Sequence, residues 1–185
     1  MASSIPIMEN PQVKELLAIM EKNQLSNLGT MTAMLNQVST LEGQLKQAVS
    51  ELTAIREELQ DVREKQRPMV QKAFNAAQAQ TLALGDKLNA LKQTIVASCE
   101  KALSAVRQKG ISALGNISQF FKIRPLLEGV RGQAEKCLAS LEKLEACAEA
   151  AKRPSLRETL EQNAERSKQM FGTAPPTVKP QEQTR

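Results

Sequence analysis

The sequence predicts an all-α, elongated fold in which a long antiparallel coiled-coil hairpin leads into a small helical bundle. Two series of apolar positions carry this prediction, because both alternate steps of three and four residues, the spacing of helices wound around one another. Strands would need a period of two residues and turn residues about every ten positions, and neither occurs. The first series is Val38, Leu41, Leu45, Ala48, Leu52, Ile55, Leu59, Val62, Gln66 and Met69. The second series is Val70, Phe74, Ala77, Thr81, Leu84, Leu88, Leu91, Ile95, Ser98, Ala102 and Ala105.

The composition favours elongated helix packing over a compact enzyme. The 185 residues are 41% hydrophobic, but only four are phenylalanine and none is tyrosine or tryptophan. Those aromatic side chains anchor compact cores and many binding sites. No histidine is present, which removes the usual general base and the commonest metal ligand. The two glycine-rich nucleotide-binding motifs, GxxxxGK(S/T) and GxGxxG, do not occur in the sequence. The sequence therefore predicts a non-enzymatic protein with no catalytic residues, metal, cofactor or small-molecule substrate.

The cysteines and the distribution of apolar residues predict a cytoplasmic protein. Cys99, Cys137 and Cys147 show no CxxC spacing, and an odd number of cysteines without a signal peptide is typical of reduced, intracellular thiols. We expect Cys99 and Cys137 to pack as small apolar side chains. No run of residues approaches the roughly 18 apolar residues that a membrane span needs.

The chain is expected to begin with a flexible N-terminus, residues 1–9, followed by one elongated helical domain over residues 10–171. The first helix is predicted to begin at Asn10 and Pro11. Asparagine at a cap accepts a backbone N–H, and proline at the first helical position loses no hydrogen bond. This helix is predicted to end near Asn23.

Pro68 leaves two arrangements open for the long helices. In the first, Pro68 opens a new helix after a tight turn, and the two arms fold back antiparallel. In the second, the chain forms a single kinked rod that finds its partner by dimerising. The arms have nearly equal lengths of about 40 residues, or some 60 Å each, which favours the hairpin. Against the hairpin, residues 64–67 contain no glycine, asparagine or serine to make the turn.

The third long helix is apolar on two faces from Ile95 to Val106, so we expect more than one neighbour to cover it. The expected neighbour is a helix from Pro125 to Lys152, whose apolar positions again alternate three and four. Those positions are Leu127, Val130, Ala134, Cys137, Leu141, Leu144, Ala148 and Ala151. Between the two helices, Gly110 is predicted to end the third helix in a left-handed conformation. A short helix is predicted next, with Ile111, Leu114, Ile117 and Phe121 on one face.

The C-terminal part is predicted to hold one more helix and a disordered tail. Ser155 and Glu158 form a capping box, in which the two side chains satisfy each other's backbone N–H groups at a helix start. Residues 172–185 contain three prolines and few apolar groups, so we expect them to be disordered with polyproline character.

A basic corner between residues 101 and 131 is the candidate interaction patch. Its six cations and one carboxylate, that of Glu128, account for the whole formal charge of +5, and the segment holds two of the four phenylalanines. One interpretation is contact with nucleic-acid phosphate, with a phenylalanine stacked on an unpaired base. Another is contact with a protein or a membrane surface. A third is structural: Phe121 and Ile117 fill the end of the bundle and the cations are solvated, since no nucleic-acid-binding motif accompanies them. The patch comprises Lys101, Arg107, Lys109, Phe120, Phe121, Lys122, Arg124 and Arg131.

Three stretches of the sequence resemble a known protein family. They are NPQVKELL (Asn10–Leu17), AIREEL (Ala54–Leu59) and, most specifically, KGISALGNISQFFKIRPLLE (Lys109–Glu128). Together they resemble an uncharacterised family, a domain of unknown function, of gut Firmicutes that is often encoded on integrative or conjugative mobile elements. The likeness spans most of residues 10–150. The resemblance implies a mobile-element accessory protein in a bacterial cytoplasm, and it carries no functional residues over to this chain.

The leading functional hypothesis is a non-enzymatic interaction or scaffold protein. It would hold a protein partner or a second copy of itself along the coil through its leucine and isoleucine seam. The first alternative is an accessory protein that binds nucleic acid through the basic corner. The second alternative is an inhibitor of a host defence protein. The salt dependence of binding distinguishes the leading hypothesis from the first alternative. Phosphate-driven binding weakens steeply as the salt concentration rises, and an apolar helix contact does not.

Overall fold

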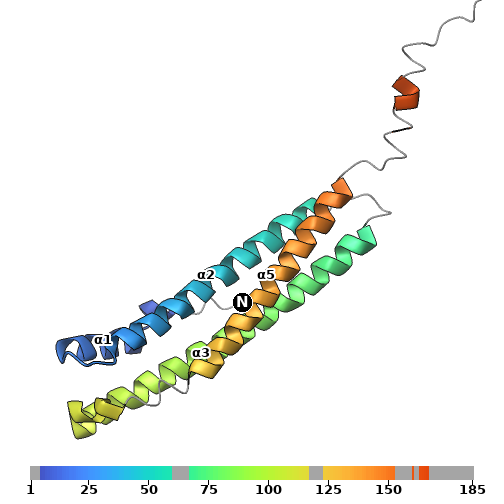
Figure 1. Ribbon diagram of the computed structural model, residues 1–185. Coiled ribbons are helices and arrows are strands. Elements are labelled where there is room, and N and C mark those ends of the chain that lie inside the picture. Colours follow the sequence, from blue (N-terminus) through green and yellow to red (C-terminus); the bar gives the residue numbers. More distant parts are fainter. Residues whose placement is uncertain (1–4, 60–66, 117–122, 153–159, 161–162, 167–185) are drawn as a thin grey trace, which may run out of the picture.

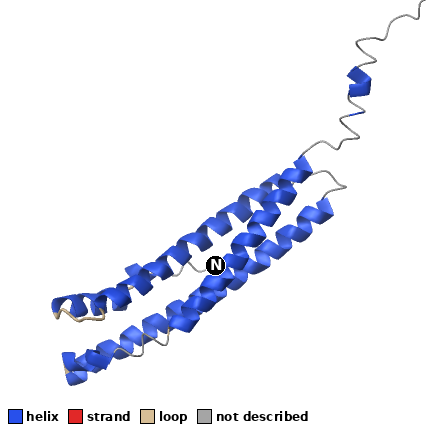
Figure 2. Ribbon diagram, in the orientation of Figure 1, coloured by secondary structure: helices blue, strands red, loops and turns tan. Residues whose placement is uncertain are grey.

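A computed structural model gives the structure of the protein, and it describes residues 5–59, 67–116, 123–152, 160 and 163–166 (Figure 1). Every regular element in these residues is helical, which confirms the all-α prediction (Figure 2). The elements are η1 (Ile7–Glu9), α1 (Pro11–Lys22), α2 (Leu28–Glu58), α3 (Arg67–Lys109), η3 (Ile111–Asn116) and α5 (Arg124–Lys152).

The helices α2 and α3 form an antiparallel hairpin that runs the length of the rod (Figure 1). Two contacts fix their direction: Glu42 pairs with Lys92, and farther along α2 the side chain of Leu45 lies over Gly85. The predicted hairpin is confirmed, and the single kinked rod is wrong. Pro68 lies in the first turn of α3, where a missing backbone N–H costs no intrahelical hydrogen bond. Of the predicted turn at residues 64–67, Arg67 begins α3, and residues 64–66 lie outside the described residues.

Most of the two apolar series is buried, as the three–four spacing requires. The buried members include Val38, Leu41, Leu52, Ile55, Leu84, Leu88, Leu91 and Ile95. Among the described members of the two series Met69 alone is exposed, at 54% at the start of α3, whereas Leu45, Ala102 and Ala105 are half-buried. Beyond Ile95 the buried positions move to Cys99 and Leu103, and Ser98 becomes half-buried. The drift follows from the 3.6-residue turn of a straight helix, which rotates a strict seven-residue repeat by about 20° per heptad.

Two different helices form a third layer on the hairpin, one at each end (Figure 1). At the end near residues 59 and 67, α5 packs antiparallel to α3, with Cys137 against Thr81. At the other end, α1 packs against α3, and Glu15 pairs with Arg107. Burial of Val13, Leu16 and Met20 accounts for the apolar face of α1.

The prediction that α5 covers Ile95–Val106 is therefore wrong. Gln133 of α5 contacts Gln80 and Lys87, so α5 begins level with about residue 96 and lies along roughly the first two-thirds of α3. After α3 ends, η3 packs back against α3 and supplies part of the cover that α5 was expected to give. Leu114 of η3 and Ile123, which directly precedes α5, are both buried.

Several predicted helix ends are confirmed. The side-chain oxygen of Asn10 accepts hydrogen bonds from the backbone N–H groups of Gln12, at 3.0 Å, and Val13, at 3.3 Å. α1 ends at Lys22, next to Asn23. Gly110 ends α3 with φ of 75°, a left-handed conformation that a residue with a Cβ adopts at a cost.

The flexible N-terminus predicted for residues 1–9 does not extend to residues 5–9. Ile7 is fully buried in η1, because polar groups of α2 and α3 hold the segment against the hairpin. The disordered tail over residues 172–185, the capping box at Ser155 and Glu158, and the predicted helix positions Ile117 and Phe121 lie outside the described residues.

The packing of α5 predicts a large effect of Leu144→Ala on stability. Leu144 is fully buried, so its truncation leaves a cavity and should lower the free energy of unfolding by about 2–5 kcal/mol. Leu126→Ala on the same helix is the matched control, because Leu126 is 47% exposed and its truncation should cost less than about 0.5 kcal/mol. Urea unfolding followed by circular dichroism measures both changes, and equal losses would contradict this packing.

Candidate functional site

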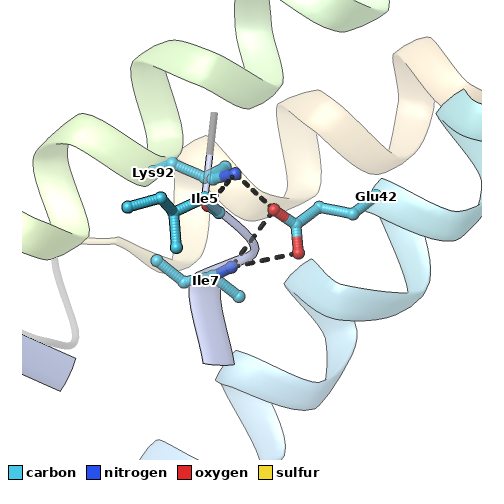
Figure 3. Close-up of polar contacts among 4 residues, drawn as sticks. All are labelled: Ile5, Ile7, Glu42 and Lys92. Atoms are coloured by element: carbon cyan, nitrogen blue, oxygen red, sulfur yellow. Dashed lines mark hydrogen bonds and ion pairs between the residues drawn. The ribbon is translucent and has the colours of Figure 1, made fainter. Parts of the chain in front are cut away.

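A buried ion pair lies between α2 and α3 near the middle of the hairpin (Figure 3). The side chains of Lys92 and Glu42 are only 10% and 18% exposed. The Lys92 ammonium also donates a hydrogen bond to the carbonyl oxygen of Ile5, at 2.8 Å. The backbone N–H of Ile7 donates to the Glu42 carboxylate, 3.2 Å from each oxygen. Both charges are thus used to bind the N-terminal segment, which gives the pair a structural role.

A second polar cluster joins α3 to α5. The amide group of Gln133, a buried side chain, donates to the side-chain oxygen of Gln80 at 2.7 Å and accepts from the Lys87 ammonium at 3.1 Å. Thr81 donates its hydroxyl hydrogen to the carbonyl oxygen of Ala77, so the Cys137 thiol, 3.2 Å away, is left to donate to the threonine oxygen. These bonds satisfy polar groups inside an apolar interface and so fix how α5 is aligned on α3.

Sequence reasoning missed both polar clusters. Lys92 directly follows the predicted core position Leu91, and Gln133 directly precedes the predicted core position Ala134. The apolar spacing does not indicate that either polar residue is itself buried. Lys92 binds Ile5 of the N-terminal segment and Glu42 of α2, and these three residues are each more than 30 residues apart in the sequence. A lysine has three donors on a flexible stem, so spacing within one helix does not identify its acceptors.

The cysteines are free thiols, as predicted, and Cys99 and Cys137 are both buried. Burial and, to a smaller extent, the neighbouring Glu100 carboxylate together raise the pKa of Cys99 from 9.0 to about 12. A thiol with so high a pKa stays protonated and unreactive near neutral pH. Cys99 therefore packs as a small apolar side chain, as predicted.

The described part of the basic corner divides into two groups. Lys101, Arg107 and Lys109 lie on the last turns of α3, whereas Arg124 and Arg131 lie on α5. Because Gln133 contacts Lys87, Arg131 lies level with the middle of α3, about 30 Å along the rod from Lys109. Phe120, Phe121 and Lys122 of the predicted patch lie outside the described residues.

Ion pairs neutralise some cations of the basic corner. Arg107 lies 3.1 Å from a Glu15 oxygen, and Arg131 lies 3.4 Å from a Glu135 oxygen. Both pairs are exposed, so each contributes little to stability. Lys101, Lys109 and Arg124 are exposed and make no ion pair within the described residues. Among the described residues of the corner, these three cations are the ones free to meet an anionic partner.

An open groove of about 380 Å³ lies between the end of α2 and the start of α3. Its buried floor consists of Leu59 and Phe74. Four exposed polar side chains line it: Arg56, Gln71, Asn75 and Gln78. The amide of Gln71 donates to Asn75 at 3.0 Å, and Arg56 makes no ion pair among the residues that the structure describes. An apolar floor with amide walls and one cation suits an apolar side chain flanked by a carboxylate.

The described residues contain neither a metal-binding cluster nor a membrane-crossing helix. No three cysteine or acidic side chains gather there in a way that could hold a metal ion. In the same residues, none of the helices has the length and apolar character that crossing a membrane requires.

Comparison with known proteins gives one finding. The model of a family of unknown function, DUF6674, matches residues 9–144. The match covers α1, α2, α3 and most of α5, and it confirms the coarse part of the resemblance, an uncharacterised family. No curated protein and no solved structure is significantly similar to the chain.

The buried ion pair predicts a large loss of stability for Glu42→Ala. The substitution leaves the Lys92 charge buried without its carboxylate, which should lower the free energy of unfolding by about 3–5 kcal/mol. Glu135→Ala, which breaks the exposed pair with Arg131, should cost less than about 0.5 kcal/mol. Urea unfolding compares the two variants, and hydrogen exchange should show faster exchange of the Ile7 amide in Glu42→Ala only. An unchanged Ile7 amide would show that the carboxylate does not hold the segment.

The raised pKa of Cys99 predicts a pH dependence of stability. Above pH 9 the unfolded chain releases the thiol proton, whereas the folded chain keeps it up to about pH 12. The folded state then binds more protons, so stability falls as the pH rises through this window and is unaffected below it. Urea midpoints of wild type and Cys99→Ala should therefore converge as the pH rises above 9. Parallel curves would contradict the burial of the thiol.

Proposed function

The chain belongs to a family of unknown function, DUF6674, and from that premise we propose that it is a non-enzymatic helical interaction module. One observation carries the proposal: the leucine seam is buried inside a single chain. The helices therefore form a preformed rod, and its outer faces are the surfaces left to bind a partner. A preformed face loses little conformational entropy on binding, which suits a scaffold.

The buried seam changes where a partner or a second copy would bind. Leu52, Leu88 and Leu91 are covered by the other helices of the same chain. A second copy that used the seam would have to displace α1 or α5 and expose their own buried side chains. Each such side chain costs about 1.5–3 kcal/mol to return to water. We therefore place the partner on the outer surface of the rod.

The side-chain chemistry supports a binding role over catalysis. The sequence holds no histidine. The buried charges of Glu42 and Lys92 bind backbone groups of the N-terminal segment, and the thiol of Cys99 is held protonated. The six residues that line the groove include no serine, threonine or cysteine to act as a nucleophile.

One observation favours nucleic acid as a second candidate partner. Lys101 and Lys109 lie two turns apart at the end of α3, both exposed and without an ion pair in the described residues. Two free ammonium groups on one helix end suit phosphate contact. Arg124, which is equally free, begins α5 and lies farther back along the rod.

We also propose a cellular setting, which rests on the sequence resemblance. The chain would be a mobile-element accessory protein in a bacterial cytoplasm that binds another protein or a second copy of itself. Inhibition of a host defence protein is one form that such an interaction could take, because an inhibitor needs only a rigid complementary surface.

Salt dependence tests the proposed function. The full chain is used to capture proteins from host lysate, and its binding to single-stranded DNA is measured by fluorescence anisotropy, both over a range of salt. A protein complex that persists as salt rises supports the interaction module. DNA binding with a steep salt slope, and no retained protein, would contradict it and favour the second candidate.

A double substitution identifies the surface in the same experiment. Lys101→Gln with Lys109→Gln should leave a protein complex on the rod intact but lower the salt slope of single-stranded DNA binding by about 1.4. The matched control is Lys136→Gln with Lys143→Gln, two exposed cations on α5. An equal effect of both pairs on DNA binding would show that the end of α3 is not a specific phosphate site.

A further inference from the structure

The N-terminal arm, residues 5–22, consists of η1 and α1 and packs on the hairpin toward one end of the rod (Figure 1). The carbonyl oxygen of Ile5 accepts a hydrogen bond from Lys92, and the backbone N–H of Ile7 donates to Glu42 (Figure 3). The fully buried side chains of the arm are Ile7, Val13, Leu16 and Met20. The site that holds the arm lies on α2 and α3, so it would accept an identical arm from a second copy of the chain.

The connection from the arm to α2, residues 23–27, begins with a strained turn. The backbone N–H of Leu25 donates to the carbonyl oxygen of Met20, and that of Gln24 donates to Glu21, both at 3.0 Å. This pair of bonds is a Schellman motif, which needs a left-handed residue and usually has glycine there. Gln24 occupies that position with φ of 51°, and among the described residues it alone has a positive φ without being glycine. A Cβ disfavours the left-handed conformation by roughly five-fold or more, so opening this turn relieves strain.

The sequence of the connection also permits an open form. Residues 23–27 contain neither glycine nor proline, so they can continue a helix. Met20 and Met31 are both buried and lie 11 residues apart, about three helical turns. A helix that continued from α1 into α2 would therefore keep the buried faces of both on one stripe. The connection lies at the end of the rod (Figure 1), so the arm can swing outward without crossing another element.

We propose that two copies of the chain exchange their N-terminal arms, each arm filling on the other copy the site that it fills in the closed monomer. The exchanged dimer keeps every contact of the arm and opens two left-handed turns. Against it, two molecules lose their independent motion. In dilute solution the closed monomer prevails, because the tethered arm meets its own site at an effective concentration in the millimolar range.

Arm exchange provides a way for two copies to join without exposing the buried side chains of α1. A second copy that simply displaced the arm would leave these side chains in water, whereas exchange buries them again on the other copy. The inference goes beyond the proposed function, because it concerns the chain alone. Its failure would leave a partner on the outer surface of the rod untouched.

Refolding at two concentrations tests the proposal with the unaltered chain. The chain is refolded from urea at about 1 mM, near the effective concentration of a tethered arm, and also in the micromolar range. Size-exclusion chromatography with light scattering should show a dimer, of twice the 20.3 kDa chain mass, only after concentrated refolding. On dilution the dimer should revert slowly, since each arm must leave its site before it can close.

A cross-link between chains locates the arm in the dimer. Glu15 of the arm and Arg107 of α3 are paired at 3.1 Å, so Glu15→Cys and Arg107→Cys are made in separate chains that also carry Cys147→Ala. The two chains are mixed in urea, refolded together at the high concentration and treated with a short bismaleimide. Arm exchange should cross-link one chain to the other. The matched control replaces Arg107→Cys by Arg131→Cys, an exposed position on α5, and should give no such product.

Gln24→Gly tests the strained turn. Glycine removes the strain of the closed form, and two turns open in each dimer, so the dissociation constant of the dimer should rise by roughly 25-fold. Ser26→Gly is the matched control, because Ser26 is equally exposed in the same connection and has no positive φ. Sedimentation equilibrium measures both constants after the forms have equilibrated, and circular dichroism confirms that each variant is folded.

Three results would overturn the proposal. A chain that is monomeric after refolding at every concentration does not exchange its arm. A dimer without the cross-link between positions 15 and 107 joins through other surfaces. Equal dissociation constants for Gln24→Gly and Ser26→Gly would show that the left-handed turn does not favour the open form.

Discussion

The contact between α2 and α3 is the interaction on which the other elements depend. Its leucine and isoleucine side chains are buried along most of the hairpin, and each is worth about 1.5–3 kcal/mol when removed from water. Two helices alone cannot cover both sides of such a seam, so a third layer is required. α1 and η1 provide it at one end and α5 at the other, and the seam is then no longer available to another molecule.

Buried polar groups give this apolar packing a unique alignment. Helices with a regular repeat can slide by one heptad and meet a similar set of side chains. Sliding α2 past α3 would separate Lys92 from Glu42 and leave a buried charge unpaired, and sliding α5 would separate Gln133 from Gln80. Such losses cost several kcal/mol for a charge and about 1–3 kcal/mol for a neutral group. The polar clusters therefore specify the arrangement that the leucines stabilise.

The sequence predicted the helices better than their placement, for a physical reason. Local spacing determines which face of α3 or α5 is apolar, and the buried positions of α5 from Leu127 to Ala151 agree with it. The same spacing fits either half of α3, so it could not show which part of α3 packs against α5. The prediction of the basic corner failed for the same reason: its cations are close in sequence but lie on two different helices, and Arg131 of α5 lies far from Lys109 of α3. The groove at Arg56 and Phe74 joins residues of two helices, which spacing within one helix does not reveal.

The seam between α2 and α3 is filled by helices of the same chain. Unfolding at several protein concentrations tests this most directly. The account predicts that the urea midpoint is independent of concentration and that the native protein scatters light as a 20.3 kDa monomer where the midpoint is measured. If two chains shared the seam, folding would require association, and the midpoint would rise with protein concentration. A rising midpoint would therefore contradict the account.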